Sequence, residues 1–200
     1  MIKTENLYKV YGDKSDEAMA GIENGMSPKE IRDETGSVPA VIDVNVEAKK
    51  DESFVIMGLS GSGKSTLVRC INRLVEPTKG SVYLEDSSGE VVNVTTLDNE
   101  GLREVRQNRI SMVFQEFALF PHMSVLENVI YGLKVKGEDN CEKKGKEMLD
   151  EVGLNGWEDV SPSELSGGMK QRVGVARAFV TNSDVVLMDE PFSALDPLIR

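Results

Sequence analysis

The sequence has few cysteines and no long hydrophobic run, and these absences exclude several classes of protein. Its two cysteines, Cys70 and Cys141, are too far apart for a metal-binding or redox motif and too few for a disulfide scaffold. We therefore expect a reducing compartment such as the cytoplasm. No stretch approaches the ~20 consecutive apolar residues that span a bilayer. Residues 1–6 lack the apolar segment of a signal peptide.

Basic side chains are also scarce. The 23 lysines and arginines are outnumbered by 34 acidic residues, so the formal net charge is −11. Proteins that bind nucleic acids normally carry a basic stripe that neutralises phosphates, so no nucleic-acid partner is expected. One nucleotide needs only a few well-placed cations and is compatible with this charge. The 40% share of apolar residues indicates an ordinary globular chain of one or two domains.

Apolar runs and amphipathic segments alternate along most of the chain. This pattern predicts an α/β fold with a largely parallel central sheet. Strands are predicted at residues 2–10, 41–46, 54–57, 110–114 and 185–188, with a hairpin from 81–85 and 91–94. Helices are predicted at residues 63–74, 96–107, 124–136, 139–152 and 166–181. The polar segment 13–37 is predicted to be an inserted helix, in which Ser27, Pro28 and Glu30 form a capping box.

The strand pattern stops between residues 117 and 164. Two helical segments occupy this stretch, and Gly153 stands where the second of them should end. We interpret residues 117–165 as a helical subdomain, inserted into a nucleotide-binding core that consists of residues 1–116 and 166–200.

A glycine-rich segment carries the clearest chemistry. Gly58, Gly63, Lys64 and Ser65 satisfy the phosphate-loop pattern, in which two glycines flank four residues and a lysine and a serine follow. Glycines allow backbone N–H groups to curl around phosphate oxygens, and the helix that follows offers its positive end to the same anion. The residues predicted to contact ATP in this loop are Ser60, Gly61, Ser62, Gly63, Lys64, Ser65 and Thr66. Lys64 is predicted to bridge the β- and γ-phosphates, and Ser65 to bind Mg²⁺.

Two acidic residues, Asp189 and Glu190, directly follow the apolar run 185–188. A carboxylate at the end of a parallel strand points into the ligand crevice of an open α/β sheet. Asp189 is therefore predicted to support Mg²⁺, and Glu190 to orient or deprotonate the attacking water. The alternative is a solvated strand end without function.

A second anion-binding pattern occurs at the start of a predicted helix. Ser166, Gly167 and Gly168 combine a capping hydroxyl with unobstructed backbone amides. Two phosphate-type sites in one chain are explained if two subunits pair head to tail, so that each helix completes the other subunit's nucleotide site. The alternative is an ordinary helix start.

The order of these motifs resembles that of the ATP-binding subunits of ABC transporters over nearly the whole chain. The motifs, in order, are the phosphate loop at 58–66, Gln115 after a strand, the signature motif at 165–171, Asp189 and Glu190, and residues 193–196. The resemblance implies one ABC ATPase domain with a P-loop NTPase, RecA-like parallel sheet, an antiparallel β part and a helical subdomain. It also implies ATP and Mg²⁺ as cofactors.

The resemblance assigns further roles. Gln115 would be the Q-loop residue that contacts Mg²⁺ and the attacking water, Ser166 and Gly168 would meet the γ-phosphate across the dimer, and Asp196 would lie in the D-loop at the dimer interface. Tyr11 would stack on adenine, although Tyr11 or Tyr8 could equally be strand surface.

The implied partners are a second copy of the chain, transmembrane permease subunits and, indirectly, an extracytoplasmic substrate-binding protein. The implied location is the cytoplasmic face of the cell membrane, as a peripheral subunit.

Finer features resemble the uptake ATPases for glycine betaine, proline betaine and related quaternary amines. They are the insert at 13–37, the phosphate loop with Met57, the segment 117–123 and residues 192–200. Pro191 departs from this subfamily, which often has alanine there. The expected function is ATP hydrolysis that drives osmolyte uptake.

One departure concerns histidine. The family places a switch histidine on a strand after the D-loop, whereas the single histidine here, His122, precedes the signature motif and reads as a surface residue. The chain is therefore expected to be a fragment of a longer protein, or a module that binds ATP with little hydrolysis. A chromosome-maintenance ATPase is a weaker alternative, because no sustained heptads separate the motifs.

Two smaller features leave alternatives open. A run of apolar residues could seat a membrane subunit or form the subdomain's own core, namely Phe114, Phe117, Phe120, Met123 and Val125. The basic residues of the signature helix, Lys170, Arg172 and Arg177, are interpreted as dimer or surface contacts rather than as a phosphate clamp.

Overall fold

The computed structural model describes residues 1–86 and 88–191. The chain divides into two compact units, Met1–Leu102 and Arg103–Arg200, and each is considered by itself. The first unit begins with β1 and ends within α4, which crosses the boundary between the units. The elements up to this helix are β1 (Ile2–Tyr11), α1 (Ser15–Glu23), α2 (Pro28–Thr35), β2 (Val38–Ala48), α3 (Lys64–Ile71), β3 (Lys79–Glu85), β4 (Val91–Asn93), η1 (Val94–Thr96) and α4 (Asn99–Asn108). They are followed by β5 (Ile110–Val113), α5 (Val125–Lys136), α6 (Cys141–Glu151), η2 (Pro162–Glu164), α7 (Gly167–Phe179) and β6 (Val185–Met188).

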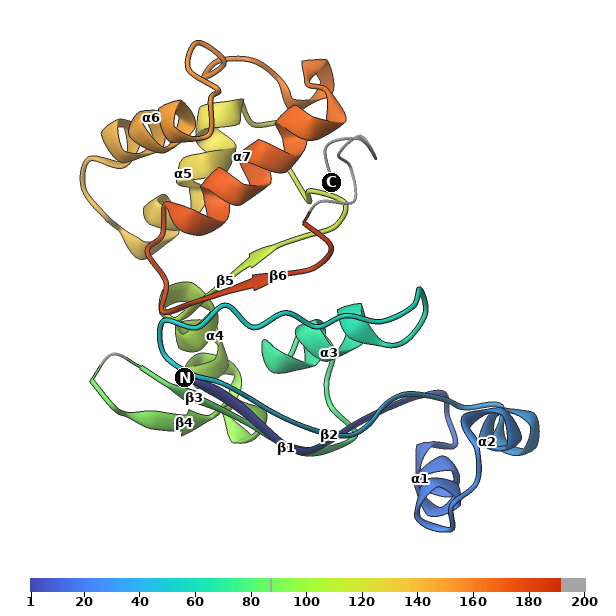
Figure 1. The fold of residues 1–200 in the computed structure, drawn as a ribbon. Coiled ribbons are helices and arrows are strands. Elements are labelled where there is room, and N and C mark those ends of the chain that lie inside the picture. The colour runs from blue at the N-terminus through green and yellow to red at the C-terminus, as the bar shows by residue number, and fades with distance from the viewer. Residues whose placement is uncertain (87, 192–200) are drawn as a thin grey trace. The chain divides into compact units, whose positions relative to one another are not determined.

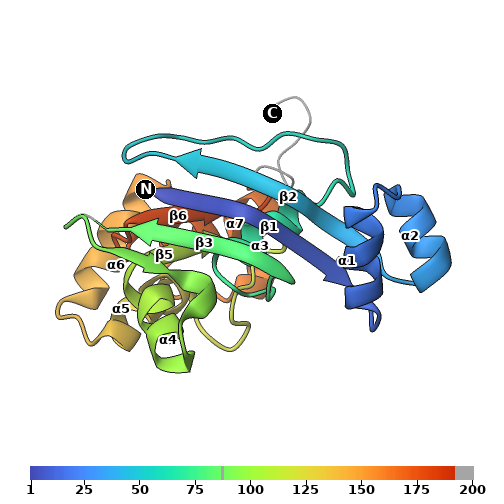
Figure 2. The ribbon, with the colours of Figure 1, turned by 90° about the horizontal axis from the view of Figure 1, so that it is seen from below.

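The first unit is built on an antiparallel sheet with the strand order β2-β1-β3-β4. Figure 2 shows β2, β1 and β3 of this sheet side by side. One side of β1 is buried through Ile2, Thr4, Leu7 and Val10, and α3 packs on β1 and β2. The predicted hairpin is confirmed as β3 and β4. The Asp86 carboxylate accepts from the backbone amides of Ser88 and Glu90 in its turn, at 2.8 and 3.0 Å.

The predicted insert forms two short helices, α1 and α2, beyond the ends of β1 and β2 (Figure 1). The capping box is confirmed, because Ser27 Oγ accepts from the Glu30 amide at 3.3 Å and Glu30 accepts from the Ser27 amide at 2.7 Å. Ala18 and Ile31 are fully buried and pack with Val10 in a small apolar cluster. The insert therefore folds as a helical hairpin between the end of β1 and the start of β2.

The prediction of a strand at residues 54–57 is wrong. These residues form no strand, and Val55 and Met57 are 73% and 88% exposed. An apolar run favours burial between neighbouring strands, but it becomes a strand only where its backbone finds a partner edge. The outer strands of this sheet are β2 and β4, and the run pairs with neither. The phosphate loop is therefore followed by a helix but not preceded by a strand.

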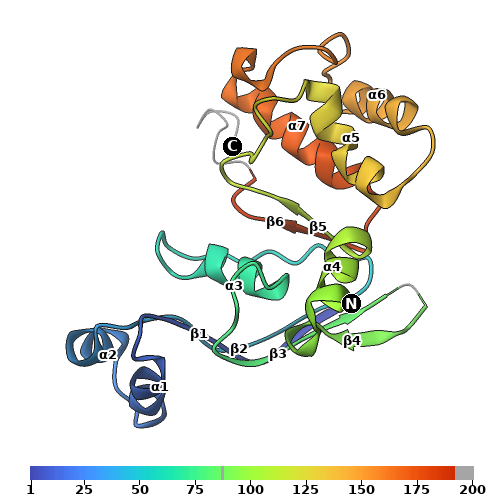
Figure 3. The same cartoon turned by 180° about the vertical axis from the view of Figure 1, so that it is seen from behind.

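The second unit contains a two-stranded parallel sheet, β5 and β6, with α5, α6 and α7 forming a helical cluster (Figure 3). The predicted parallel sheet is thus limited to this pair among the described residues. Every predicted helix of this unit forms, and α5 begins with a second capping box between Ser124 and Glu127. The apolar core of the cluster is formed by Val125, Leu126, Val129, Ile130, Leu133, Leu149, Leu154, Leu165, Val173, Ala176 and Val180.

The predicted helical subdomain, residues 117–165, contains α5, α6 and η2 and no strand. The helix that follows it, α7, contributes Val173 and Ala176 to the same core. The contact boundary after Leu102 falls elsewhere, so the division into a core and a subdomain stays a prediction.

Candidate functional site

The phosphate loop requires glycine at position 63 because of a contact with a distant strand, which the motif does not reveal. Gly63 caps α3 in the left-handed conformation, with φ +88°. A Cβ atom at this position would lie 2.1 Å from the carbonyl oxygen of Ala40, which belongs to β2. Gly61 also has a positive φ, +77°, but faces open space. Glycine at position 63 is therefore required by both the backbone conformation and the approach of β2.

Lys64, the first residue of α3, turns its ammonium back toward the loop. Its Nζ donates to the carbonyl oxygens of Gly58 at 3.0 Å and of Leu59 at 2.9 Å. Ser65 and Thr66 follow in the first helical turn and are half-buried, whereas Ser60 is exposed. The loop thus places a cation, hydroxyl groups and the start of a helix around one point, which suits an anionic ligand.

Tyr11 lies beside this helix. Its hydroxyl is 3.5 Å from Thr66 Oγ1, its side chain is 42% exposed, and the Lys9 ammonium lies 5.0 Å from its ring centroid. Tyr8, the alternative candidate, is half-buried, with Lys79 over its ring at 5.8 Å. Tyr11 is therefore the tyrosine that contacts the helix of the phosphate loop, and its stacking on adenine stays a prediction.

The three polar residues predicted after the parallel strands lie together in the second unit. Gln115 Nε2 donates to Glu190 Oε2 at 3.1 Å. Asp189 is 2% exposed, and its amide donates to the Val113 carbonyl oxygen at 3.0 Å. Glu190 is exposed and has φ +47°, a left-handed conformation that is uncommon for residues other than glycine. The structure thus brings Gln115 and Glu190 into contact at the end of β6.

The predicted signature residues form a helix start. Ser166 caps α7, and its Oγ accepts from the Met169 amide at 3.3 Å. Gly167 and Gly168 are the first two residues of the helix, and Ser166 and Gly167 are exposed. The capping hydroxyl and the exposed backbone are the features expected of an anion-binding helix end. Asp196 and the rest of the predicted D-loop lie outside the described residues.

The arginines of α7 contact backbone carbonyls of their own unit, and Arg172 is also a surface residue, as predicted. Arg177 Nη1 and Nη2 donate to the carbonyl oxygens of Ala118 and Phe117, both at 2.7 Å, and burial lowers the pKa of its guanidinium. Arg172 is exposed but donates to the carbonyl oxygens of Val152 and Gly153 at 3.1 and 3.2 Å. Both arginines therefore hold the backbone of their own unit.

The residues of the predicted apolar run near Gln115 are buried or half-buried. Val125 is fully buried in the helical core, and the Phe120 ring lies 4.7 Å from the ring of Tyr131. His122 is exposed, in agreement with its interpretation as a surface residue. A role of Phe114, Phe117 and Phe120 in seating a membrane subunit stays a prediction.

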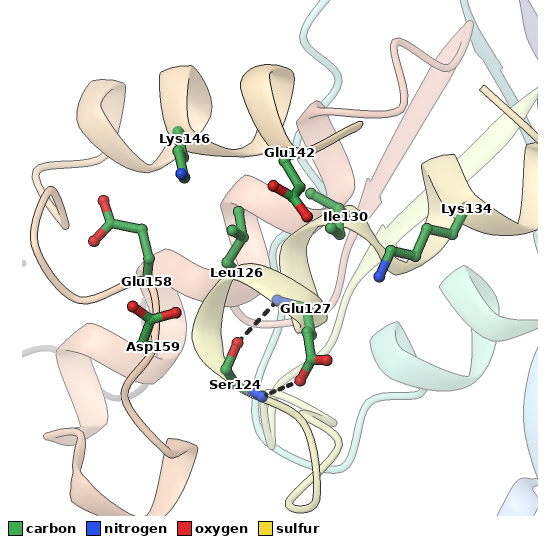
Figure 4. A pocket seen from close by; sticks show the side chains of 9 residues that line it. All are labelled: Ser124, Leu126, Glu127, Ile130, Lys134, Glu142, Lys146, Glu158 and Asp159. Carbon is green, nitrogen blue, oxygen red and sulfur yellow. Dashed lines mark hydrogen bonds between the residues drawn. The ribbon is translucent and has the colours of Figure 1, made fainter. Parts of the chain in front are cut away.

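A groove of about 550 Å³ lies between α5 and α6 (Figure 4). Four carboxylates and two lysines line it, namely Glu127, Glu142, Glu158, Asp159, Lys134 and Lys146. This excess of negative charge disfavours a triphosphate. No group of three His, Cys, Asp or Glu side chains that could hold a metal ion occurs in residues 1–86 and 88–191.

The fold and the site together are those of an α/β nucleotide-binding protein with a phosphate loop and a helical cluster. The model of the ABC transporter family matches residues 41–193, and the chain belongs to this family. The resemblance to ABC transporter ATPases and the predicted fold class are confirmed. Membership of this family implies ATP binding.

Several relatives of known function are similar to this chain over its whole length. The chain is 52% identical over its whole length to the glycine betaine transport ATP-binding protein OpuAA of Bacillus subtilis and covers 47% of that protein. It is 48% identical over its whole length to the glycine betaine/proline betaine transport ATP-binding protein ProV of Escherichia coli and covers 49% of it. The chain thus spans about half the length of the curated relatives it matches.

Among solved structures, a dimeric post-hydrolysis state of the ATP-binding cassette MJ0796 bound to ADP and Pi resembles the chain with a TM-score of 0.80. The two are 32% identical, and the match covers 99% of this chain and 77% of that one. In the part of the chain that the structure describes, no helix is long and apolar enough to cross a membrane.

Proposed function

We propose that this chain binds ATP with Mg²⁺ and hydrolyses it as the ATP-binding subunit of an importer for glycine betaine, proline betaine or a related quaternary amine. The observation that carries the proposal is the phosphate loop, in which the Lys64 ammonium lies 3.0 and 2.9 Å from two carbonyl oxygens of its own loop. A phosphate oxygen is a stronger acceptor for an ammonium than a carbonyl, because its hydrogen bond is charge-assisted. Lys64 would therefore exchange its loop carbonyls for the β- and γ-phosphates.

The residues predicted to hold Mg²⁺ suit this ion chemically. Ser65 offers a hydroxyl, Gln115 an amide oxygen and Asp189 a buried carboxylate, and magnesium prefers such oxygen ligands together with water and substrate phosphates. When bound, the ion would supply positive charge that stabilises the transferring phosphoryl group. Glu190 would orient or deprotonate the water, with Gln115 holding its carboxylate in place.

The proposed assembly contains two copies of the chain. Ser166, Gly167 and Gly168 of one copy would contact the γ-phosphate on the phosphate loop of the other, with Asp196 near the interface. The dimeric structures of MJ0796 support this arrangement. The proposed partners are permease subunits at the cytoplasmic face of the membrane and, indirectly, a substrate-binding protein on the other side. The names of the relatives, which are transport ATP-binding proteins, support a role in transport.

The test is a titration of the purified protein with a fluorescent ATP analogue and Mg²⁺, followed by an assay of phosphate release. Lys64→Ala should weaken ATP binding about 10- to 100-fold, because it removes a charge-assisted contact. Lys50→Ala, which removes an exposed lysine before the loop, is the control and should bind normally.

Absence of ATP binding by the wild-type protein would contradict the proposal. ATP binding without phosphate release would favour the alternative of a binding module with little hydrolysis. The transported solute is tested by uptake of radiolabelled glycine betaine in cells that express the protein with its membrane subunits. Uptake that persists after Lys64→Ala would contradict a role in transport.

A further inference from the structure

Arg177 connects the helix that begins at the signature residues to the segment that contains Gln115. It lies in the last turn of α7, and its guanidinium spans the carbonyl oxygens of Phe117 and Ala118 at 2.7 Å each. Among the described residues, these two carbonyls are its hydrogen-bond partners. A planar guanidinium presents its N–H groups as a fixed fork, so one side chain can hold two successive carbonyls.

The segment held by Arg177 is in an unfavourable conformation. Phe117 and Ala118 have φ values of +62° and +48°, although neither is a glycine. Left-handed conformations at two successive side-chain-bearing residues persist only where the surroundings hold them. The two carbonyls that Arg177 binds belong to the same two residues. The contact is therefore placed where it can stabilise the unusual backbone.

The environment of Arg177 indicates a dedicated contact. The side chain is partly buried, and its desolvation is the cause that lowers its pKa. An arginine keeps its charge in proteins, so its burial is unfavourable unless hydrogen bonds compensate for the lost water. Carbonyl oxygens bound by a charged donor provide this compensation.

The two constrained residues belong to the same turn as Gln115. The amide of Phe117 donates to the Phe114 carbonyl oxygen at 3.1 Å, and the amide of Ala118 donates to that of Glu116 at 2.7 Å. These bonds make residues 114–118 one tight turn that directly follows β5. Gln115 lies inside this turn and donates to Glu190 at 3.1 Å. A change at Phe117 and Ala118 would therefore alter the position of Gln115.

We propose that Arg177 is a positioning residue that holds Gln115 beside Glu190 through the backbone of Phe117 and Ala118. The contact ties the signature helix to the Gln115 segment, so a displacement of α7 would move both. This inference rests on the proposed function only where it concerns hydrolysis, because the effect on the backbone of residues 114–118 is independent of nucleotide.

Hydrogen exchange of the nucleotide-free protein, followed by mass spectrometry, tests the structural part. Arg177→Met should accelerate exchange in residues 114–120 about tenfold or more, and Arg177→Lys should have a smaller effect because one ammonium can still reach a carbonyl. Arg172→Met is the matched control, because Arg172 lies on the same helix and binds two carbonyls at the end of α6. It should leave residues 114–120 unchanged. Equal acceleration by both Met variants, or none with Arg177→Met, would overturn the proposal.

Kinetics test the positioning role in the protein assembled with its partners. Arg177→Met should lower kcat about 100-fold while the Kd for ATP stays unchanged, since small misplacements at a reaction centre are costly. In a Gln115→Ala background, Arg177→Met should cause no further loss. A full additional loss in that background would show a merely structural role and overturn the proposal.

If Arg177→Met does not fold, Arg177→Lys supplies both measurements. A wild-type protein that fails to bind ATP would refute the proposed function and leave the exchange result to decide the role of Arg177.

Discussion

Gln115 and Glu190 are joined by a hydrogen bond of 3.1 Å because of the register of two parallel strands. In the pair β5 and β6, Val113 lies opposite Met188. Gln115 and Glu190 each follow at the second position beyond these partners. Parallel strands end at the same edge of a sheet, so residues at equal distances from the paired ends meet there. This register places both residues at the same edge of the sheet, where the proposed contact of Arg177 with Phe117 and Ala118 would hold Gln115.

Replacement of the carboxylate at position 190 tests its proposed role with water. Glu190→Gln should retain ATP binding, because the loop that holds Lys64 is unchanged, and should lower kcat about 10²- to 10⁴-fold through loss of general-base assistance. The measurements are ATP affinity and steady-state phosphate release by the full protein.

Glu116→Gln is the control for this prediction. Glu116 is also an exposed carboxylate and directly follows Gln115. Its replacement should leave the rate near that of the wild type. Undiminished phosphate release by Glu190→Gln would remove Glu190 from the mechanism.

Substitutions of Tyr11 and Tyr8, the two tyrosines of β1 that are candidates for stacking on adenine, should affect nucleotide affinity differently. Tyr11→Ala should weaken ATP binding about tenfold, since stacking of a base on an aromatic ring contributes about 1–3 kcal/mol. Tyr11→Phe should bind nearly as well as the wild type, because the ring remains and its hydroxyl contact with Thr66 is long, at 3.5 Å. Equilibrium titration measures both. If Tyr8→Ala weakens binding and Tyr11→Ala does not, the assignment to Tyr11 is wrong.

Gly63→Ala should destabilise the protein more than Gly61→Ala. Both positions have a positive φ, so an added side chain causes conformational strain of about 1 kcal/mol or more at either. Of these two positions, only position 63 would also bring the new Cβ against a carbonyl oxygen, that of Ala40 at 2.1 Å. Urea unfolding without nucleotide measures the difference in the free energy of unfolding. Equal effects would show that β2 does not restrict the loop.

The buried thiol of Cys70 in α3 should make stability depend on pH at the alkaline end. Burial raises the pKa of Cys70 from 9.0 to about 11 in the folded state. The thiol of the unfolded chain ionises near its ordinary value, so this contribution to stability is complete below pH 9. It declines as the pH rises from 9 to about 11, because only the unfolded chain then gains the ionised form.

Urea midpoints between pH 8 and pH 11 check the prediction for Cys70, with Cys70→Ala as the comparison that should show a weaker decline. Thiol labelling of the native protein at pH 8 provides a second measurement. Cys141, which is partly exposed, should react, and Cys70, which is fully buried, should not. Rapid labelling of native Cys70 would contradict its burial.

Local features of the sequence predicted most elements of this fold. The capping boxes of α2 and α5 form as their sequences require, because both partners of each box lie within one helical turn. The hairpin β3–β4 likewise follows from turn residues that bind each other. The absence of a strand at residues 54–57 could not be predicted, because strand formation depends on a partner strand from elsewhere in the chain.

The candidate site shows the same division. The motifs around Lys64, Ser166 and Asp189 are contiguous, so the sequence by itself specified their residue types, their order and the family to which they belong. Contacts between distant segments were decided only by tertiary structure, because burial and strand register are not properties of a local pattern. Three such contacts are the packing of the Ala40 carbonyl against Gly63, the hydrogen bond from Gln115 to Glu190 and the hydrogen bond from Arg177 to Phe117.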